Sequence, residues 1–255
     1  MITAPVIRTL FFLFLALAWW SAATLHLCPP SLLPTPAAVG EFLLAALRDG
    51  TLIPALLTSL SRVGLGYLIS LALGGALGLL LARSPLADAT LGSVVTGLQS
   101  LPSICWYPLA LLWFGITEKA VLFVVVMGAI FAVALAVRAG IRTLPPLWLK
   151  AARMLGARGF NLWRRVLLPA ILPAFLAGMR QGWAFAWRSL MTAELLSPSL
   201  KIGAGHLLST GRNFNNMPMV VGMIALILAL GLLVERVLFL PLDRLVARRW
   251  GVEGA

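Results

Sequence analysis

Residues 120–137 read AVLFVVVMGAIFAVALAV, an uninterrupted run of apolar and small side chains that contains no charge. An α-helix rises 1.5 Å per residue, so about 20 such residues cross the hydrocarbon core of a bilayer, which is about 30 Å thick. Inside that core the backbone must satisfy its own hydrogen bonds, and a helix does so within one segment. The stretch therefore predicts a membrane-spanning helix and an all-α fold.

Comparable charge-poor windows recur along the chain and predict five further spanning helices. They cover residues 9–27, 63–82, 89–117, 170–195 and 217–234. The composition agrees, because apolar residues make up 61% of the 255 positions and charged residues only 11%. A soluble protein of this length could not cover so much apolar surface. The sequence thus predicts a polytopic membrane protein with six transmembrane helices in a single domain, residues 1–255.

The formal net charge of +12 indicates the orientation of the helices rather than a nucleic-acid partner. The basic residues lie between hydrophobic windows and form no single stripe, which a nucleic-acid-binding face would require. Arg8, Arg83, seven lysines and arginines between 138 and 165, and four arginines between 236 and 249 share one side of a six-helix topology. The positive-inside rule makes that side cytoplasmic, so both termini are expected in the cytoplasm, below a bacterial inner (plasma) membrane.

The first window has an alternative reading as a signal peptide, because Ser21-Ala22-Ala23 offers small residues for cleavage. The small residues that lipoprotein processing needs just before Cys28 are absent. We therefore expect residues 9–27 to be a retained helix. Residues 38–47 predict a short amphipathic helix that lies along the outer surface.

Residues that could carry catalysis or hold a metal are sparse. Cys28 and Cys105 form no CxxC pair, and His26 and His206 have no HExxH spacing. The sequence has no GxxxxGK[ST] stretch, so the chain is not expected to bind ATP through a P-loop. We expect a non-enzymatic protein without a cofactor or metal of its own. A membrane-embedded enzyme would need a metal-ligand set, or a nucleophile with a base.

The longest cytoplasmic connection, residues 138–168, contains the stretch Lys150-Ala-Ala-Arg-Met-Leu-Gly156. Ala151 and Ala152 predict a short helix with a small, flat face, and Gly156 permits the sharp turn that ends it. Such an element can dock in a groove on another protein. The alternative is an ordinary basic connector, which is rich in arginine because it is cytoplasmic.

The third window is longer than a straight span requires and contains Pro102 and Pro108. Proline interrupts a helix, and a broken helix at membrane depth is tolerated only against protein or a water-filled cavity. Gln99, Ser103 and Trp106 are therefore candidates to line the route of a transported solute. The alternative is a simple proline kink.

The fifth window is unusual because it carries charged residues. Arg180, Trp187 and Glu194 recur every seven residues, which places them on one stripe of a helix within about 40°. Charges inside a bilayer are costly and tend to face the bundle interior, where Arg180 and Arg188 can attract an anion. Candidates to line the solute route on this helix are therefore Arg180, Trp187, Arg188 and Glu194. Alternatively, each arginine snorkels to an interface or forms an ion pair with Glu194 or Glu235.

The spacing in the cytoplasmic connection resembles the EAA-x3-G-x9-I-x-L-P signature of ABC-importer permeases. Ala151-Ala152, Gly156 and Val166-x-Leu168-Pro169 occupy signature positions, and Lys150 stands where the family usually has glutamate. Further stretches look like the nitrate/sulfonate/taurine/bicarbonate branch of these permeases. They are residues 34–36 (PTP), 58–66 (TSLSRVGLG), 98–102 (LQSLP), 108–115 (PLALLWFG) and 193–194 (AE).

This resemblance implies a type I ABC-importer permease fold, in which the 138–168 loop provides coupling helices that sit in a cleft of a cytoplasmic ATPase. The residues implied to couple to the ATPase are Lys150, Ala151, Ala152, Gly156, Leu168 and Pro169. Lys150 has the opposite charge to the family's usual glutamate, so the salt bridge that the glutamate forms with the ATPase is not expected here, whereas the docking surface is. The resemblance also implies a permease homodimer in membrane lipid, two ABC ATPase subunits that bind ATP and Mg, a periplasmic or lipid-anchored solute-binding protein, and alternating access.

The implied solute is a small anion of the sulfonate, taurine, nitrate or bicarbonate class. Arg188 is a candidate for substrate choice, because the family pattern is usually apolar there. Relatives in this branch also carry pyrimidine vitamin precursors, so both solute classes stay open. A rival hypothesis is a self-sufficient channel or secondary transporter, which often has inverted repeats or paired broken helices. This sequence has one broken helix and no repeat.

Overall fold

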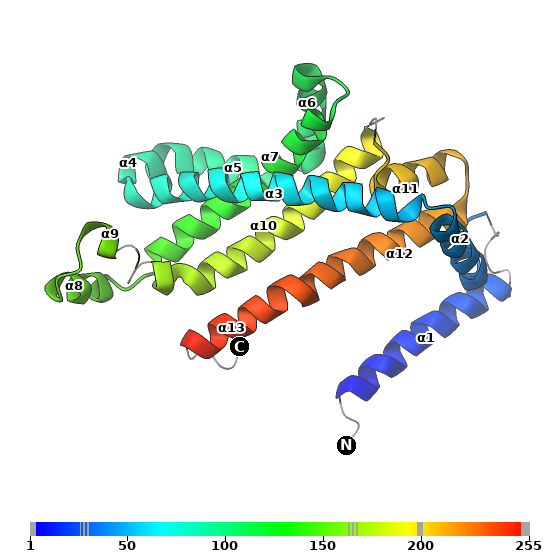
Figure 1. Cartoon of the computed structure of the whole chain (residues 1–255), viewed down its shortest axis with the longest axis horizontal. Coiled ribbons are helices and arrows are strands. Elements are labelled where there is room, and N and C mark those ends of the chain that lie inside the picture. The colour runs from blue at the N-terminus through cyan, green and yellow to red at the C-terminus, as the bar shows by residue number, and fades with distance from the viewer. Residues whose placement is uncertain are drawn as a thin grey trace. The chain divides into compact units, whose positions relative to one another are not determined.

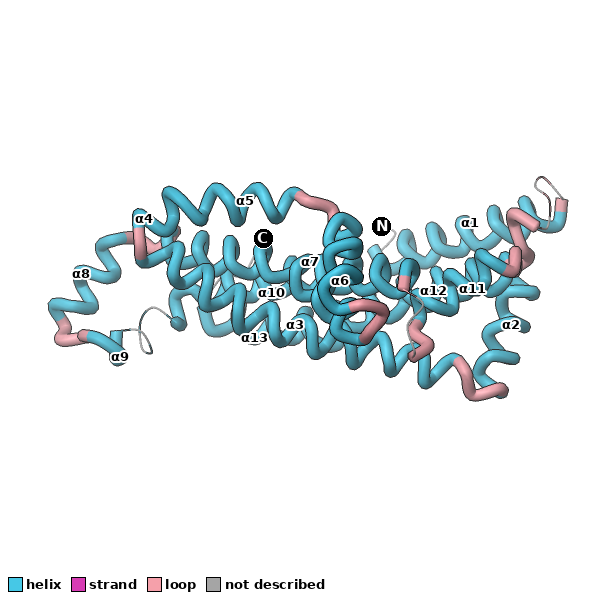
Figure 2. Tube along the Cα trace, turned by 90° about the horizontal axis from the view of Figure 1, so that it is seen from above, coloured by secondary structure: helices cyan, strands magenta, loops and turns pink. Residues whose placement is uncertain are grey.

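The computed structural model describes residues 4–250 except 26, 28, 30, 163, 165, 167 and 198–200. His26, Cys28 and Arg165, which entered the sequence predictions, lie outside these described residues. All regular structure in the described residues is helical (Figure 1, Figure 2), which confirms the all-α prediction. The chain divides into two compact units, Met1–Ser59 with Lys201–Ala229 and Leu60–Leu200 with Leu230–Ala255.

The first unit contains α1 (Ala4–Thr24), α2 (Pro36–Arg48), α11 (Ala204–Asn213) and the adjoining parts of two longer helices. Thr35 caps α2, because its side-chain oxygen accepts a hydrogen bond from the Ala38 N–H at 3.2 Å. The buried centre of the unit is formed by Ala46, Leu52, Ala204 and Met223. The short helix expected at residues 38–47 is therefore present as α2.

The second unit is built on α3 (Leu52–Arg83, from Leu60 onward), α7 (Glu118–Arg142) and α10 (Leu168–Leu196). Helices α7 and α10 pack side by side (Figure 1, Figure 2). α12 (Met217–Val234) also ends in this unit and continues without a break into the π-helix η4 (Glu235–Phe239) and α13 (Leu240–Trp250). The short elements are α4 (Pro85–Ala87), the π-helix η1 (Asp88–Gly92), α5 (Ser93–Ser100), the 3-10 helix η2 (Ser103–Cys105), α6 (Trp106–Phe114), α8 (Pro146–Met154) and α9 (Gly159–Leu162).

Small residues allow the long helices of the second unit to approach closely. A Cβ added at Gly74 of α3 would lie 2.5 Å from the Ile130 carbonyl oxygen of α7, and one at Gly78 would overlap the Ala134 carbonyl oxygen. A Cβ at Gly178 of α10 would overlap the Ala136 side chain of α7. Close packing at small residues is a main source of association between membrane helices. The glycine pair of α3 therefore serves packing within the chain.

Three helices in the described residues are long and apolar enough to cross a membrane: Leu52–Arg83, Glu118–Arg142 and Met217–Arg248. They contain the predicted windows 63–82, 120–137 and 217–234. The windows 9–27 and 170–195 are also helical, as α1 and α10. Within the described residues, these two helices are not among the three that are both long and apolar enough to cross a membrane. The chain is thus a multi-pass membrane protein, while the count of six spans stays a prediction.

The window 89–117 is not one span, because the helix stops at Ser100 and restarts at Ser103. Leu101 and Pro102 are extended, with ψ angles of 128° and 138°, since a residue before proline avoids the helical conformation. Pro108 was also expected to interrupt the helix, and this was wrong. It lies in the first turn of α6, where a missing backbone N–H costs nothing.

Candidate functional site

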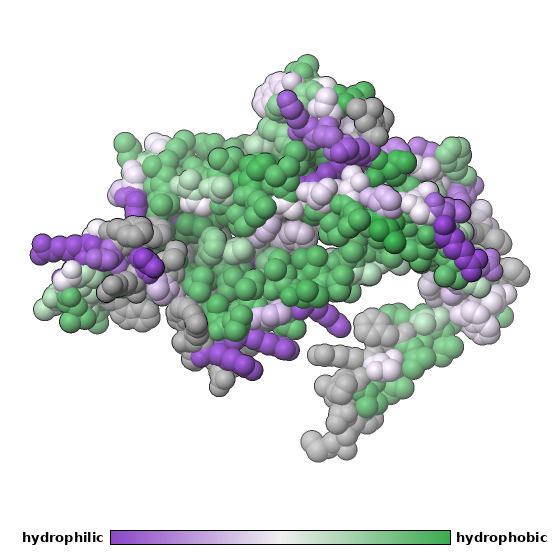
Figure 3. All heavy atoms as spheres, viewed as in Figure 1, coloured by the Kyte–Doolittle hydropathy of each residue, from purple (hydrophilic) through white to green (hydrophobic). Residues whose placement is uncertain are grey.

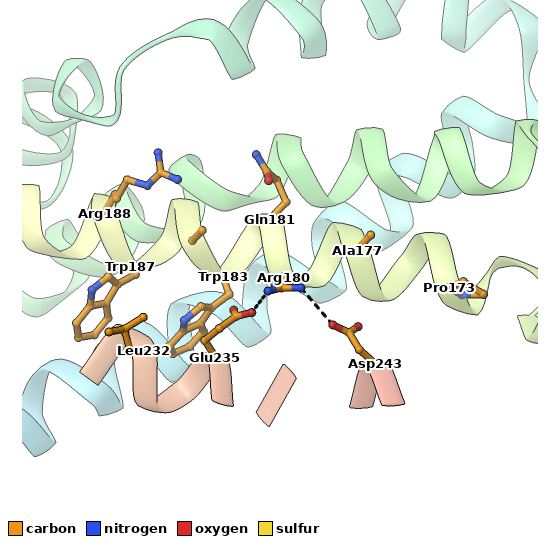
Figure 4. A pocket seen from close by; sticks show the side chains of 12 residues that line it. Pro173, Ala177, Arg180, Gln181, Trp183, Trp187, Arg188, Leu232, Glu235 and Asp243 are labelled. Atoms are coloured by element: carbon orange, nitrogen blue, oxygen red, sulfur yellow. Dashed lines mark hydrogen bonds and ion pairs between the residues drawn. The ribbon is translucent and has the colours of Figure 1, made fainter. Parts of the chain in front are cut away.

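An open pocket of about 610 Å³ lies between α10 and the continuous last helix, which consists of α12, η4 and α13 (Figure 4). The α10 residues recur at spacings of three, four and seven, which places them on one helical stripe. Gly231 of α12 lies beside the indole ring of Trp187, since a Cβ added there would be 3.6 Å from Nε1, an ordinary contact distance. The pocket is lined by Pro173, Ala177, Arg180, Gln181, Trp183, Ala184, Trp187, Arg188, Gly231, Leu232, Glu235 and Asp243.

Arg180 is held by two carboxylates of the last helix. Its guanidinium forms ion pairs with Oε1 of Glu235 and, at 3.2 Å, with Oδ2 of Asp243. Eight residues of regular α-helix would turn these carboxylates about 80° apart, but the π-helix η4 absorbs roughly one extra residue and brings them onto one face. Of the sequence alternatives for Arg180, the structure shows the ion pair with Glu235. Its charge is therefore compensated.

Arg188 differs from Arg180, because no carboxylate of the described residues pairs with it. Its side chain is exposed, and its guanidinium carbon lies 5.2 Å from the centre of the Phe185 ring. Figure 4 shows Arg188 and Gln181 pointing to the same side of α10. Gln181 was not predicted, although its seven-residue spacing from Arg188 could have identified it.

Aromatic side chains form the wall of the pocket next to the last helix. Trp183 and Trp187 stack with their ring centres 6.3 Å apart and their planes 16° from parallel. Tyr67 of α3 meets Trp183 edge to face at 5.5 Å and donates its hydroxyl to the Met179 carbonyl oxygen at 2.6 Å. Trp183 was not predicted. The lining of the pocket therefore includes a stacked tryptophan pair on the side of the last helix, and Arg188, which points to the other side of α10 in Figure 4.

Glu194, a predicted pathway residue, lies outside this pocket. It is 1% exposed, and its Oε1 accepts a hydrogen bond from Arg62 of α3 at 2.7 Å. The same arginine donates from Nε and Nη2 to Glu118 of α7 at 2.7 and 2.6 Å. Burial makes the Glu194 carboxylate inaccessible to a solute here. Sequence reasoning gave Arg62 no role, because its partners Glu118 and Glu194 lie 56 and 132 positions away in the chain.

The broken segment places Gln99, Ser103 and Trp106 apart from the lining of the α10 pocket. Gln99 and Ser103 are half-buried. Trp106 packs against Phe123 and Phe131, with ring centres 6.4 and 6.2 Å apart. The structure thus gives Trp106 a packing role, and a solute route along this segment stays a prediction.

The predicted coupling residues divide into three groups. Lys150 and Ala151 are exposed on α8, whereas Ala152 is 8% exposed and packs inward. Gly156 ends α8 with a φ angle of +84°, a conformation that glycine adopts without strain. Leu168 and Pro169 begin α10 instead of lying on the coupling helix. The sequence analysis did not identify three apolar side chains that are exposed on α8 and its turn: Leu147, Met154 and Leu155 are 72%, 88% and 89% exposed.

Asp88 of η1 joins the broken segment to the end of α7, just before the coupling loop. It forms ion pairs with Arg138 and, at 2.6 Å, with Arg142. The hydrogen bond from Arg138 and the nearby guanidinium charges lower the pKa of Asp88 below its ordinary value. The described residues contain no cluster of histidine, cysteine and carboxylate side chains suited to a metal ion.

The three long apolar helices define a multi-pass membrane protein, and its α10 pocket contains an arginine that has no carboxylate partner among the described residues. Residues 74–250 match the family described as the binding-protein-dependent transport system inner membrane component, and the chain belongs to that family. It is the permease subunit of an ABC importer. It is a transport component and not an enzyme, because the ATPase of such an importer is a separate subunit.

Similar proteins place the chain in the nitrate, sulfonate and taurine branch. It is 31% identical to the taurine transport system permease protein of Escherichia coli, over 84% of this chain and 81% of that protein. It is 29% identical to a putative aliphatic sulfonates transport permease protein of Bacillus subtilis, over 92% and 85%. A nitrate import permease protein of Leptolyngbya laminosa is 30% identical over 57% and 52%.

A solved structure shares the fold. The chain matches one from inward-facing conformations of the MetNI methionine ABC transporter with a TM-score of 0.62. The match covers 77% of this chain and 95% of that chain at 20% sequence identity. The type I importer fold is thereby confirmed.

Proposed function

We propose that this permease carries a small organic anion, such as a sulfonate or taurine, past Arg188. The observation that supports this is the contrast between the two pocket arginines. Arg180 is compensated by Glu235 and Asp243, whereas Arg188 is exposed in the pocket and has no carboxylate partner among the described residues. An uncompensated charge in a membrane is costly, so a site that keeps one usually uses it.

The remaining parts of the importer follow from the family and from exposed surfaces. Two copies of the chain enclose one path, and a solute-binding protein delivers the anion from the outer side. α8, within the coupling loop 138–168, docks in an ATPase that binds ATP and Mg. Its exposed Leu147, Met154 and Leu155 offer the apolar contacts, and Lys150 and Ala151 lie beside them. The positive-inside rule supports a cytoplasmic position for both termini.

Reconstituted transport tests this proposal. The permease is co-purified with its ATPase and placed in proteoliposomes with its binding protein, and ATP-driven uptake is measured for taurine, an alkanesulfonate, nitrate, bicarbonate and a neutral pyrimidine. Arg188→Gln should lower anion uptake at least tenfold, because loss of a charge interaction that stabilises the transported anion by about 1.4 kcal/mol slows transport tenfold. Arg188→Lys keeps the positive charge and should retain most of the uptake. Arg212→Gln, which removes an exposed arginine of α11, is the control.

Each result has a defined meaning. Equal anion uptake by wild type and Arg188→Gln would remove Arg188 from the path. Uptake of the pyrimidine alone would replace the anion with the vitamin-precursor class. Uptake without ATP, by a permease that purifies without an ATPase, would favour the channel or secondary-transporter rival.

A further inference from the structure

The C-terminal part of the last helix carries Arg244 and Arg248, which neither the pocket nor the coupling helix uses. Residues 217–248 form one continuous helix, and only 11% of its most apolar window is buried inside the molecule. Lipid or another protein must cover the rest, because exposed apolar surface of this extent is not stable in water. The arginines lie at the end of the helix, where a membrane span meets the headgroup layer.

Arg244 and Arg248 of α13 line a shallow recess together with Pro241 and Leu245. These four residues are spaced i, i+3, i+4 and i+7, so they share one helical face. Both arginines are exposed, and neither forms an ion pair within the described residues. Leu245, between them, is 60% exposed.

The orientation of this face is fixed by the rest of the unit. Asp243, on a different side of α13, is tied to Arg180 of α10 at 3.2 Å. That ion pair turns the Arg244 and Arg248 face away from the pocket. Figure 3 shows hydrophilic side chains gathered at this end of the molecule, directly beside hydrophobic surface.

We propose that the Arg244–Arg248 recess binds the phosphate headgroup of an anionic phospholipid. Guanidinium groups hold phosphate oxygens in paired hydrogen bonds, and two of them one turn apart can share one phosphate. Val237 and Leu238, on the preceding turn, are 67% and 46% exposed and offer the acyl chain an apolar track into the bilayer. A soluble phosphate could use the two arginines but would gain nothing from that track.

A lipid fits this surface better than the ATPase does. The exposed residues on the turns before the recess are mostly apolar, with Val237, Leu238 and Leu240 following the apolar window 217–234, and the exposed Arg236 adds a positive charge beside them. A bilayer interface offers acyl chains and anionic headgroups together, which matches this combination of apolar and basic side chains. The proposed docking surface for the ATPase lies elsewhere, on α8 (Pro146–Met154). This inference depends only on the chain being embedded in a membrane, so it stands or falls independently of the transported solute.

Native mass spectrometry of the permease–ATPase complex tests the inference. The complex is titrated with phosphatidylglycerol, with phosphatidylcholine of the same chains, and with inorganic phosphate. Arg244→Gln/Arg248→Gln should weaken phosphatidylglycerol binding about thirtyfold, given the usual contribution of each basic residue near an anionic surface. Arg244→Lys/Arg248→Lys keeps the charge but removes the paired guanidinium hydrogen bonds, so its binding should fall between that of the wild type and that of the glutamine variant. Arg48→Gln/Arg212→Gln removes the same charge elsewhere and should have no effect.

Three results would overturn the inference. Unchanged phosphatidylglycerol binding in the double glutamine variant would place the lipid elsewhere. Equal binding of phosphatidylcholine, or an equally tight arginine-dependent adduct of inorganic phosphate, would show that no anionic lipid is selected. Loss of the ATPase from the double glutamine variant, with lipid binding intact, would make the recess a protein-docking surface. Thermal unfolding of each variant confirms that it is folded.

Discussion

Arg62 holds two carboxylates from two other helices at hydrogen-bonding distance. The Arg62 side chain is 4% exposed and that of Glu194 is 0% exposed, while Glu118 retains 35%. Nε and Nη2 of Arg62 donate hydrogen bonds to Glu118, and Nη1 donates one to Glu194. Because the three residues come from α3, α7 and α10, the cluster joins the long helices of the second unit through charge as well as through packing.

Replacing Arg62 should therefore destabilise the permease strongly. Arg62→Ala leaves the buried carboxylate of Glu194 and the partly exposed carboxylate of Glu118 without this arginine, and removal of one partner from a buried ion pair costs about 3 kcal/mol or more. We expect a clear fall in the thermal unfolding midpoint of the detergent-purified complex, followed by tryptophan fluorescence. Arg212→Ala, which removes an exposed arginine, is the matched control. Equal midpoints for the two variants would show that the cluster contributes no stability.

At the scale of elements, α3 shows how neighbouring glycines differ in role. A Cβ at Gly78 would overlap the Ala134 carbonyl oxygen and lie 2.8 Å from the Val137 Cβ of α7. A Cβ at Gly75 would meet nothing within 4 Å. Both glycines lie in the same helix, so alanine changes helix propensity equally at the two positions. A difference in stability between the two alanine variants therefore measures the packing against α7.

Gly78→Ala should lower the thermal unfolding midpoint, because overpacking a close helix contact costs about 1–3 kcal/mol. Gly75→Ala should leave the midpoint unchanged or raise it, since alanine is favoured over glycine inside a helix by up to about 1 kcal/mol. Both variants are compared with wild type in the same detergent. A fall for Gly75→Ala as large as that for Gly78→Ala would contradict the α3–α7 packing.

The turn after α8 should control how well the coupling helix docks. Gly156 and Gly50 both have positive φ angles, +84° and +69°, and open space around the missing Cβ. Alanine at either position introduces similar backbone strain, on the order of 1–2 kcal/mol. Gly156→Ala should reduce the amount of ATPase that co-purifies per permease, as measured by mass spectrometry, whereas Gly50→Ala should not. Full retention of the ATPase by Gly156→Ala would separate this turn from docking.

For the whole molecule, acid should loosen the link between the broken segment and α7. The guanidinium groups of Arg138 and Arg142 lower the pKa of Asp88 in the folded state, so the folded protein binds this proton less readily than the unfolded chain. The contribution of Asp88 is therefore complete above the unfolded carboxyl pKa of about 3.9 and is lost as the pH falls through the lowered native value.

Thermal unfolding of wild type and Asp88→Asn from pH 6 to pH 3 checks this expectation. The wild type should be the more stable of the two at pH 6, and the difference should shrink toward pH 3. The other carboxylates are common to both proteins, so their titration cancels in the comparison. A difference that stays constant across this range would exclude an ionic role for Asp88.

The sequence by itself determined the features that depend on neighbouring residues. Charge-poor windows fixed the spans at residues 63–82, 120–137 and 217–234, and Pro102 fixed the break after Ser100. Residue spacing in the loop around Gly156 pointed to the permease family, which the match over residues 74–250 confirmed. These signals survive without a structure because hydropathy, proline geometry and motif spacing are local properties of a chain.

Only the tertiary structure decided which charges are used and which are compensated. The sequence left an ion pair open for both Arg180 and Arg188, but the π-helix η4 brings two carboxylates to Arg180 and none to Arg188. Glu194 is a pathway candidate by sequence, but in the structure its carboxylate is buried and accepts a hydrogen bond from Arg62, 132 positions away. An ion pair depends on which helices meet and on how each is rotated, and no local pattern records either.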